Sequence, residues 1–393
     1  MREIDLKKME DIWRKTFTRK DFIKKCIAAG VVIGSSTYYF DLMSKHKAFA
    51  SIGEKRGMRE AMFYEKIGEE AVRCLLCPNQ CTLSNGQRGF CRVREPAGGK
   101  LYTLVYELVC SLHVDPIEKK PLFHVLPGSK AFSIATAGCN SRCKFCQNWT
   151  ISQRSPEETD NRILSAGNLI SSARNNGCKS IAYTYTEPIV FYEYVMNAGA
   201  AAKINGILNI IVTGGKINPK PLQQLCTVTD AANVDLKAFD EKYLKEVCAQ
   251  DLGNILQTLK ILKQNGVWVE ITNLIVPTLN DNMDTIRKMA RWIKSELGAE
   301  VPLHFSRFWP QYKLRSLYPT PIETLKEART LAMEEGLQYV YIGNVPDSSA
   351  ESTICPRCKN IVIKRIGYRV KEINISDKGI CKFCGNNIPG IWG

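Results

Sequence analysis

The spacing of the cysteines constrains this chain more than any other feature, because most of the sixteen fall into three groups with metal-ligand spacing. The groups are Cys74, Cys77, Cys81 and Cys91; Cys139, Cys143 and Cys146; and Cys355, Cys358, Cys381 and Cys384. The others are scattered, and we predict that they pack as small apolar side chains: Cys26, Cys110, Cys178, Cys226 and Cys248. Cysteines grouped in this way favour bound metal in a reducing setting over a disulfide scaffold.

The middle group forms one short loop with the pattern C-x3-C-x2-C, directly after an apolar run at 131–137. Three thiolates are one too few to saturate a four-iron cluster, whose fully protein-ligated form takes four cysteines. Such a loop leaves one iron open to another ligand, and an open metal position is typical of a catalytic site. Half of a zinc site and three buried thiols are the alternatives, and both explain this spacing less well.

The first group has the pattern C-x2-C-x3-C-x9-C, with Gly86 and Gly89 before its last member. Glycines permit tight turns of the backbone around a metal. Four cysteines complete the coordination of a structural Zn²⁺, and they equally suit a second, fully ligated iron–sulfur cluster that relays electrons. The spacing alone leaves both open, with a slight preference for zinc.

The third group consists of two C-x2-C pairs, and the residues between them include β-like runs at 361–363 and 368–370. Paired knuckles joined by a hairpin are typical of a zinc ribbon. We predict a structural zinc that folds a segment too small for its own hydrophobic core. A redox role is less favoured, because neither pair opens a helix in a βαβ unit.

Between the flanking groups, short apolar runs alternate with helical patterns, which predicts an α/β fold of βα units around a parallel sheet. The predicted strands are 131–137, 180–185, 208–213, 232–237, 267–276 and 303–308, with 339–342 as a candidate seventh. The predicted helices are 163–175, 191–205, 252–265, 285–297 and 322–335. Because the units fall short of the eight in a closed barrel, we predict an open, partial (β/α)6 barrel.

Catalytic groups of such a barrel lie at the carboxyl ends of its strands. Polar residues or glycines stand at those points in several successive units: Glu187, Thr213, Gly214, Asp235, Lys237 and His304. One polar residue at a strand end is usually structural, but repetition at equivalent positions indicates a binding site. The charged groups at 187, 235 and 237 suit an amino-acid zwitterion and ribose hydroxyls, which they would hold by charge-assisted hydrogen bonds.

We predict four parts of the chain: an N-terminal extension at 1–50, a cysteine-rich module at 51–125, the partial barrel at 126–345 and the ribbon-like module at 346–393. Thr18-Arg19-Lys20-Asp21-Phe22 resembles a twin-arginine export signal with its second arginine replaced by lysine. The apolar stretch that follows is too short to span a membrane. We expect a cytoplasmic protein, with export through this signal as the alternative.

The chain carries a formal net charge of +15, which attracts nucleic acid, anionic lipid or acidic proteins. The excess is spread along the chain, and no arginine-rich helix or repeat of aromatic and basic residues stands out. A solvated basic surface is therefore favoured over binding of nucleic acid.

The C-x3-C-x2-C loop, with an aromatic residue before its last cysteine, resembles the signature of the radical S-adenosylmethionine (SAM) superfamily. Further sequence segments resemble those of the pyruvate-formate-lyase-activase-like branch, and more narrowly those of the AmmeMemoRadiSam-system enzymes. They lie at 113–124, 147–149, 183–188, 231–240 and 304–308, so the resemblance runs from about residue 70 onward.

The resemblance implies a [4Fe-4S] cluster ligated by Cys139, Cys143 and Cys146, whose open iron chelates SAM for reductive cleavage to a 5′-deoxyadenosyl radical. It also implies that Asp235, Lys237 and His304 lie along SAM. Thr186-Glu187-Pro188 stands where related enzymes have Gly-Gly-Glu-Pro, so Glu187 would meet the SAM amino group. The backbone at Thr213 and Gly214 is the alternative contact.

The resemblance further implies an electron donor such as ferredoxin or flavodoxin, and Memo-type and AMMECR-type proteins as candidate partners. The resemblance does not identify the substrate. The candidate substrates are a protein that becomes a glycyl radical, a small molecule and RNA. The competing hypothesis is a non-enzymatic zinc and iron–sulfur scaffold, which would have no use for a SAM pocket.

Overall fold

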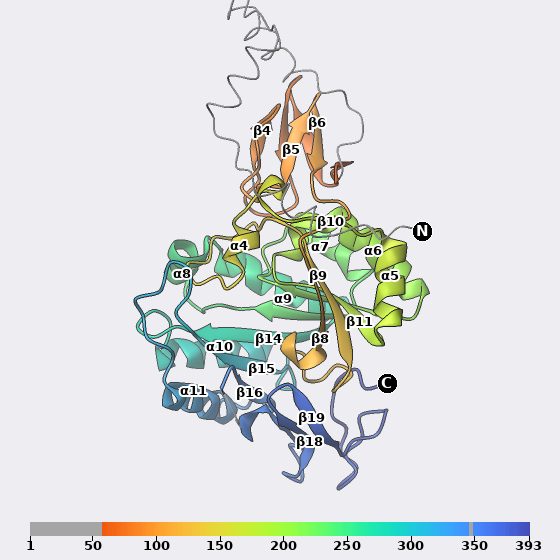
Figure 1. Cartoon of the computed structure of the whole chain (residues 1–393). Helices are drawn as coiled ribbons and strands as arrows, with labels where there is room; N and C mark the ends of the chain where they lie inside the picture. The colour runs from red at the N-terminus through yellow and green to blue at the C-terminus, as the bar shows by residue number, and fades with distance from the viewer. Residues whose placement is uncertain (1–56, 346–348) are drawn as a thin grey trace, which may run out of the picture. The chain divides into compact units, whose positions relative to one another are not determined.

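The computed structural model describes residues 57–345 and 349–393 (Figure 1). The predicted N-terminal extension, with its twin-arginine-like segment and Cys26, lies outside the described residues. None of the helices in the described part combines the length and apolarity that a bilayer crossing requires.

The centre of the fold is an eight-stranded sheet with the order β16-β15-β14-β13-β12-β11-β9-β8. Seven strands are mutually parallel, and β8 pairs antiparallel with β9 at one edge. The strands are β8 (Ser111–Pro116), β9 (Lys130–Ala135), β11 (Cys178–Tyr183), β12 (Leu208–Thr213), β13 (Ala231–Asp235), β14 (Trp268–Ile275), β15 (Leu303–Arg307) and β16 (Val340–Gly343). The open α/β sheet confirms the predicted fold class, and each predicted strand lies within about two residues of an observed one.

Helices follow the parallel strands and pack against them, as the βα alternation predicts. In Figure 1 they flank the sheet: α5 (Ala166–Asn175), α6 (Tyr192–Ile204), α7 (Pro219–Cys226), α9 (Leu252–Gln264), α10 (Met283–Glu296) and α11 (Ile322–Glu334). Side-chain oxygens of Ser165, Asp251 and Asn282 accept backbone N–H bonds at the starts of α5, α9 and α10. The sequence prediction missed α7, which begins with two prolines in its first turn.

Two small antiparallel sheets precede the central one and carry the first cysteine group. One has the order β1-β6-β5 and the other β2-β3-β4. Their strands are β1 (Arg59–Glu60), β2 (Tyr64–Ile67), β3 (Ala71–Cys74), β4 (Thr82–Ser84), β5 (Arg94–Ala97) and β6 (Lys100–Thr103). A further short pair joins β7 (Leu108–Val109) to β10 (Arg162–Ile163).

The last cysteine group lies around a three-stranded antiparallel sheet of β17 (Thr353–Ile354), β18 (Ile361–Ile366) and β19 (Arg369–Ile373). The predicted hairpin is therefore confirmed. Its apolar residues share one core with Phe123, Tyr339 and Tyr341 of the barrel. The ribbon thus packs directly on the edge of the central sheet.

Candidate functional site

The loop that carries the middle cysteine group, residues 138–146, is here named the cluster loop. Gly138 begins it with a φ of 90°, where a Cβ atom would lie 2.5 Å from the Cys91 carbonyl oxygen and 2.6 Å from Val93 Cγ1. Glycine is required at this point, because both the backbone conformation and the close approach exclude a side chain. The cluster loop therefore packs directly against the segment of the first cysteine group.

The other side of the cluster loop is held by the turn that precedes α9. The backbone N–H groups of Arg142 and Lys144 donate to the carbonyls of Cys248 (2.8 Å) and Val247 (2.9 Å). These carbonyls belong to a π-helical turn at Leu244–Cys248, where wider winding is common at functional sites. This turn and the residues at Gly138 fix the loop from two sides.

The three thiols of the cluster loop line one cavity of about 470 Å³. Cys139 accepts a backbone N–H bond from Ser141 (3.4 Å), and Cys146 Sγ lies 3.2 Å from the Ser152 hydroxyl. Burial raises the pKa of the Cys139 thiol. A thiolate in that position therefore requires a strong cationic partner, which bound iron supplies.

Cys143 differs from its neighbours because its thiol contacts Cys248. A hydrogen bond with the Cys248 thiol, followed by burial, raises the pKa of Cys143. Cys248 is fully buried, as predicted for a small apolar side chain, but it also contacts a predicted cluster ligand.

Glu187 lies in the wall of the same cavity, directly after β11 and before Pro188. Its carboxylate accepts hydrogen bonds from the Thr213 hydroxyl (2.6 Å) and the Gly214 N–H (2.8 Å). Burial raises the pKa of Glu187, and these two bonds oppose the shift. The ends of β11 and β12 thus meet in one anionic group beside the cluster loop.

Gly214 is needed for packing as well as for access by a ligand. A Cβ atom there would lie 2.4 Å from the Gln250 side-chain nitrogen. Gln250 donates from this nitrogen to the Gly214 carbonyl (3.1 Å) and to the Ser141 hydroxyl (3.2 Å). Gln250 lines the cavity, and its own side-chain oxygen is buried without a protein partner.

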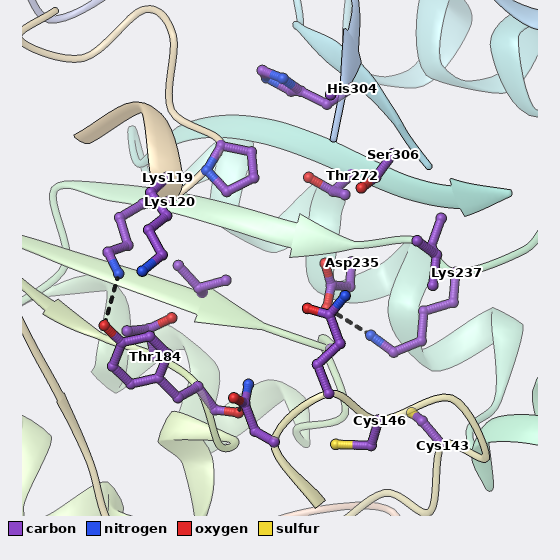
Figure 2. A pocket seen from close by; sticks show the side chains of 18 of the residues that line it. Lys119, Lys120, Cys143, Cys146, Thr184, Asp235, Lys237, Thr272, His304 and Ser306 are labelled. Atoms are coloured by element: carbon purple, nitrogen blue, oxygen red, sulfur yellow. Dashed lines mark hydrogen bonds and ion pairs between the residues drawn. The ribbon is translucent and has the colours of Figure 1, made fainter. Parts of the chain in front are cut away.

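Asp235 and Lys237 follow β13 and form an ion pair, with 2.6 Å between Lys237 Nζ and Asp235 Oδ2. Burial alone would lower the pKa of Lys237, but Asp235 and the thiols of Cys143 and Cys248 outweigh it and raise that pKa. Figure 2 shows this pair between the cluster-loop cysteines Cys143 and Cys146 and the more distant His304. Lys237 is therefore a fixed cation beside the predicted cluster.

His304 also lines the cavity, but one face of its ring is engaged within the protein. Its Nε2 lies 2.7 Å from Glu270 Oε2, and its ring packs edge-on against Phe123. Glu270 is fully buried in β14 and also accepts the backbone N–H groups of Phe123 and His124. Burial would raise the pKa of Glu270, but the bond to His304, the nearby His304 and His124 rings and the Phe123 N–H together outweigh it, so the pKa is lowered.

A second group of polar residues lies at the cavity wall formed by β8 and the turn after it. Asp115 accepts from Lys119 (2.9 Å), from Lys120 (2.6 Å) and from the Tyr185 hydroxyl. Burial alone would raise the pKa of Asp115, but these three bonds outweigh it and hold the pKa low. The two lysines face the cavity in Figure 2.

Tyr185 connects this group to the cluster loop. Its φ of 63° is uncommon for a residue with a side chain. Its carbonyl accepts from Asn148 (2.8 Å), and its ring lies 4.5 Å from Lys120 Nζ. Backbone strain of this kind concentrates at ligand sites, and Tyr185 lines the cavity.

Most of the residues predicted from strand ends therefore line one cavity with the cluster-loop thiols: Cys139, Cys143, Cys146, Glu187, Gly214, Asp235, Lys237 and His304. Thr213 contributes by orienting Glu187. The sequence prediction assigned no role to Gln250 or Glu270, since a glutamine in a loop and a glutamate inside a strand carry no distinctive pattern.

The other two cysteine groups lie elsewhere. Cys355 and Cys384 Sγ atoms are 3.7 Å apart, and those of Cys358 and Cys381 are 3.8 Å apart. Tetrahedral zinc with Zn–S bonds of about 2.3 Å places sulfurs about 3.8 Å apart, so this group has the geometry of one metal ion. Cys74, Cys77, Cys81 and Cys91 surround a separate, smaller cavity.

A family model described as the radical SAM superfamily matches residues 133–293. An uncharacterized protein of Methanocaldococcus jannaschii is 49% identical over 332 residues, which cover 84% of this chain and 99% of that protein. The pyruvate formate-lyase-activating enzyme of Clostridium pasteurianum is 26% identical over 196 residues, or 46% of this chain and 80% of that enzyme. The crystal structure of a radical SAM methyltransferase from Sphaerobacter thermophilus matches 81% of this chain and 84% of its own with 13% identity and a TM-score of 0.45.

Proposed function

The chain belongs to the radical SAM superfamily, and we propose that it cleaves SAM reductively to generate a 5′-deoxyadenosyl radical. In this proposal Cys139, Cys143 and Cys146 hold a [4Fe-4S] cluster with one iron left open to SAM. When bound, the cluster supplies the single electron that breaks the sulfur–carbon bond of SAM, which yields methionine and the radical. The radical then abstracts a hydrogen atom from the substrate.

One observation carries this proposal: the three thiols of the cluster loop share a cavity of about 470 Å³ with charged side chains from the carboxyl ends of successive strands. Glu187 offers a carboxylate to the SAM amino group, and Lys237 offers a cation to its carboxylate. A scaffold without catalysis would gain nothing from such a cavity.

The substrate remains to be identified, and the relatives suggest where to search. Pyruvate formate-lyase-activating enzymes match about half of this chain, which makes a protein that accepts a glycyl radical a reasonable first candidate. A ferredoxin or flavodoxin would supply the electron. The association with Memo-type and AMMECR-type proteins stays a prediction, as does a cytoplasmic location.

The proposal is tested by anaerobic reconstitution with iron and sulfide, followed by dithionite and SAM. We expect 5′-deoxyadenosine and methionine in equal amounts. Replacing Cys143 by alanine removes one of three protein ligands and should abolish both products, whereas Cys178→Ala, on β11 and outside the cavity, should retain them. Full SAM cleavage by the Cys143 variant would overturn the ligand assignment, and no cleavage by the native chain would overturn the function.

A further inference from the structure

The first cysteine group, here named the N-terminal cysteine site, encloses a cavity of its own. Its four cysteines, Cys74, Cys77, Cys81 and Cys91, all line a cavity of about 20 Å³. Apolar side chains complete the wall, from both the small sheets and the turn after β11: Leu76, Leu83, Ile189 and Val190. All four cysteines are free thiols. Asn79, Gln80, Arg94 and Asn140 also line this cavity, so the site combines four sulfur ligands with both apolar and polar neighbours.

The spacing of these sulfurs differs from that of the ribbon. We compared groups of three or more possible metal ligands among the described residues. The ligand atoms lie within 4.8 Å of one another in the ribbon group: Cys355, Cys358, Cys381 and Cys384. The N-terminal cysteines do not meet this condition, although they surround one cavity. Neither do the three thiols of the cluster loop.

One zinc ion draws its four sulfurs to about 3.8 Å from one another. In a four-iron cluster each thiolate binds a different iron, so the sulfurs stand farther apart and enclose the inorganic core. Within this one chain, the N-terminal cysteine site thus resembles the cluster loop and differs from the ribbon. This difference in sulfur spacing points to the same kind of occupant as at the cluster loop.

Hydrogen bonds to these sulfurs fit a cluster that changes its charge. The Phe90 N–H donates to Cys81 Sγ (3.4 Å), and the Arg94 guanidinium donates to Cys74 Sγ (3.7 Å). Arg94 is only 2% exposed and is held by an ion pair with Glu193. Donors and a buried cation beside the sulfurs stabilise the additional negative charge of a reduced cluster.

The N-terminal cysteine site also adjoins the cluster loop. Asn79, between Cys77 and Cys81, donates to the carbonyl of Asn140 (3.2 Å), which directly follows Cys139. Lys216 Nζ donates to Asn79 Oδ1 (2.6 Å), and Asn140 donates to the Lys216 carbonyl (2.7 Å). The two thiol sets are therefore separated by little more than one layer of hydrogen-bonded backbone and amide groups.

We propose that Cys74, Cys77, Cys81 and Cys91 hold a second, fully protein-ligated [4Fe-4S] cluster that conducts electrons to the cluster loop. One electron from a low-potential donor, such as a reduced ferredoxin, enters at this site and leaves to the cluster bound by Cys139, Cys143 and Cys146. No bond is formed or broken in this step, and no proton need move. The conducting role rests on the proposed function, whereas the cluster itself does not.

The decisive measurement separates the two sites. In the full-length variant with Cys139, Cys143 and Cys146 all replaced by alanine, the proposal predicts about four iron and four sulfide per chain after anaerobic reconstitution. It also predicts a dithionite-reduced paramagnetic spectrum that SAM does not change. About two zinc and no iron in that variant would overturn the proposal, and so would an empty site.

A second variant tests the proposal even if the first variant does not fold. Cys77→Ser in the otherwise native chain should lower the iron content from about eight to about four and leave the zinc of the ribbon in place. Its SAM cleavage should fall when a ferredoxin supplies electrons and much less when dithionite does, while Cys178→Ser should change neither. Loss of one zinc with unchanged iron would contradict the cluster, and equal rates with ferredoxin would contradict the conducting role. If the measured iron contents agree with the prediction but the native chain does not cleave SAM, only the proposed function is overturned.

Discussion

At the scale of single residues, His124 joins segments that are far apart in the chain. Its Nδ1 lies 2.7 Å from the Pro389 carbonyl, and its Nε2 lies 2.7 Å from the Tyr341 hydroxyl. A carbonyl can only accept, so Nδ1 carries the proton and Nε2 accepts from Tyr341. Burial lowers the pKa of His124 from 6.5 to about 4, and the ring is fully buried and neutral.

This neutral ring predicts a defined loss of stability in acid. Between pH 6.5 and about 4 the unfolded state binds a proton at His124 and the native state does not, so stability falls as the pH is lowered through this range. The contribution is about 3 kcal/mol in the free energy of unfolding, complete above pH 6.5. Urea unfolding of the metal-loaded chain at several pH values should show a shallower decline in His124→Asn. His113→Asn, on the exposed side of β8, is the matched control, and an unchanged decline in the His124 variant would contradict the assignment.

Glu187 carries the second prediction at this scale. Glutamine keeps the shape of the side chain but removes the charge that would pair with the SAM amino group. Loss of one charge-assisted contact should weaken SAM binding by about 1.5–3 kcal/mol, or about tenfold to a hundredfold. The change that SAM causes in the paramagnetic spectrum of the reduced cluster measures this affinity. The cluster itself should remain, because no ligand is changed, and unaltered affinity would move the contact to the backbone at Thr213 and Gly214.

At the scale of elements, the sequence predicts the strands and helices that have a clear local pattern of apolar residues. The buried parallel strands are mostly apolar runs, so all of them could be identified from the sequence. The edge strand β8 could not, because its Leu112 and Val114 are about 40% exposed and its pairing with β9 is a long-range event. The π-helical turn at Leu244–Cys248 carries no such pattern either, and only the folded chain brings Cys248 to Cys143.

The same limit applies to the candidate site. Residues at strand ends could be predicted, since parallel strands present their carboxyl ends at one edge. Gln250 lies in a loop and contacts Gly214 after β12, whereas Glu270 lies within β14 and contacts His304 on the neighbouring strand β15. Their roles depend on tertiary geometry, which composition and spacing do not encode.

One buried ion pair contributes to the attachment of the small sheets to the barrel. Arg94 of β5 pairs with Glu193 of α6, and the Met62 N–H also donates to Glu193 (2.7 Å). Replacing Glu193 by glutamine leaves Arg94 buried without its counter-charge, which should lower the free energy of unfolding by about 3–5 kcal/mol. The exposed pair Lys100–Glu60 is the matched control, and Glu60→Gln should cost less than about 1 kcal/mol. Urea unfolding at equal metal content measures both, and equal effects would contradict this role.

At the scale of the whole molecule, the ribbon is built into the barrel. The buried Arg365 of β18 donates to the Phe123 carbonyl (2.6 Å) and the Thr353 hydroxyl (2.9 Å), and Tyr368 lines the cavity of about 470 Å³. A metal held by the four ribbon cysteines would therefore support one wall of the candidate site.

Loss of that metal should therefore unfold the ribbon and open the cavity. Structural zinc contributes about 10–16 kcal/mol to small modules of this kind, far more than their apolar contacts. Cys358→Ser should lower the zinc content by one per chain and expose residues 353–393 to proteolysis. The iron content should stay the same, because no iron ligand is changed. Cys110→Ser, outside the three cysteine groups, should change neither zinc nor proteolysis, and unchanged zinc in Cys358→Ser would contradict the assignment.

The contact of His124 with residues near 390 also determines when the molecule can be completed during synthesis. Pro389 is translated 265 residues after His124, and Ile391 pairs beside Val125 only at that stage. Until then the His124 ring lacks its partner at Pro389 and its ring contact with Trp392. Contacts of such long range form late and slowly. Closure of the chain around His124 is therefore expected to be one of the last steps of folding, after the ribbon has been translated.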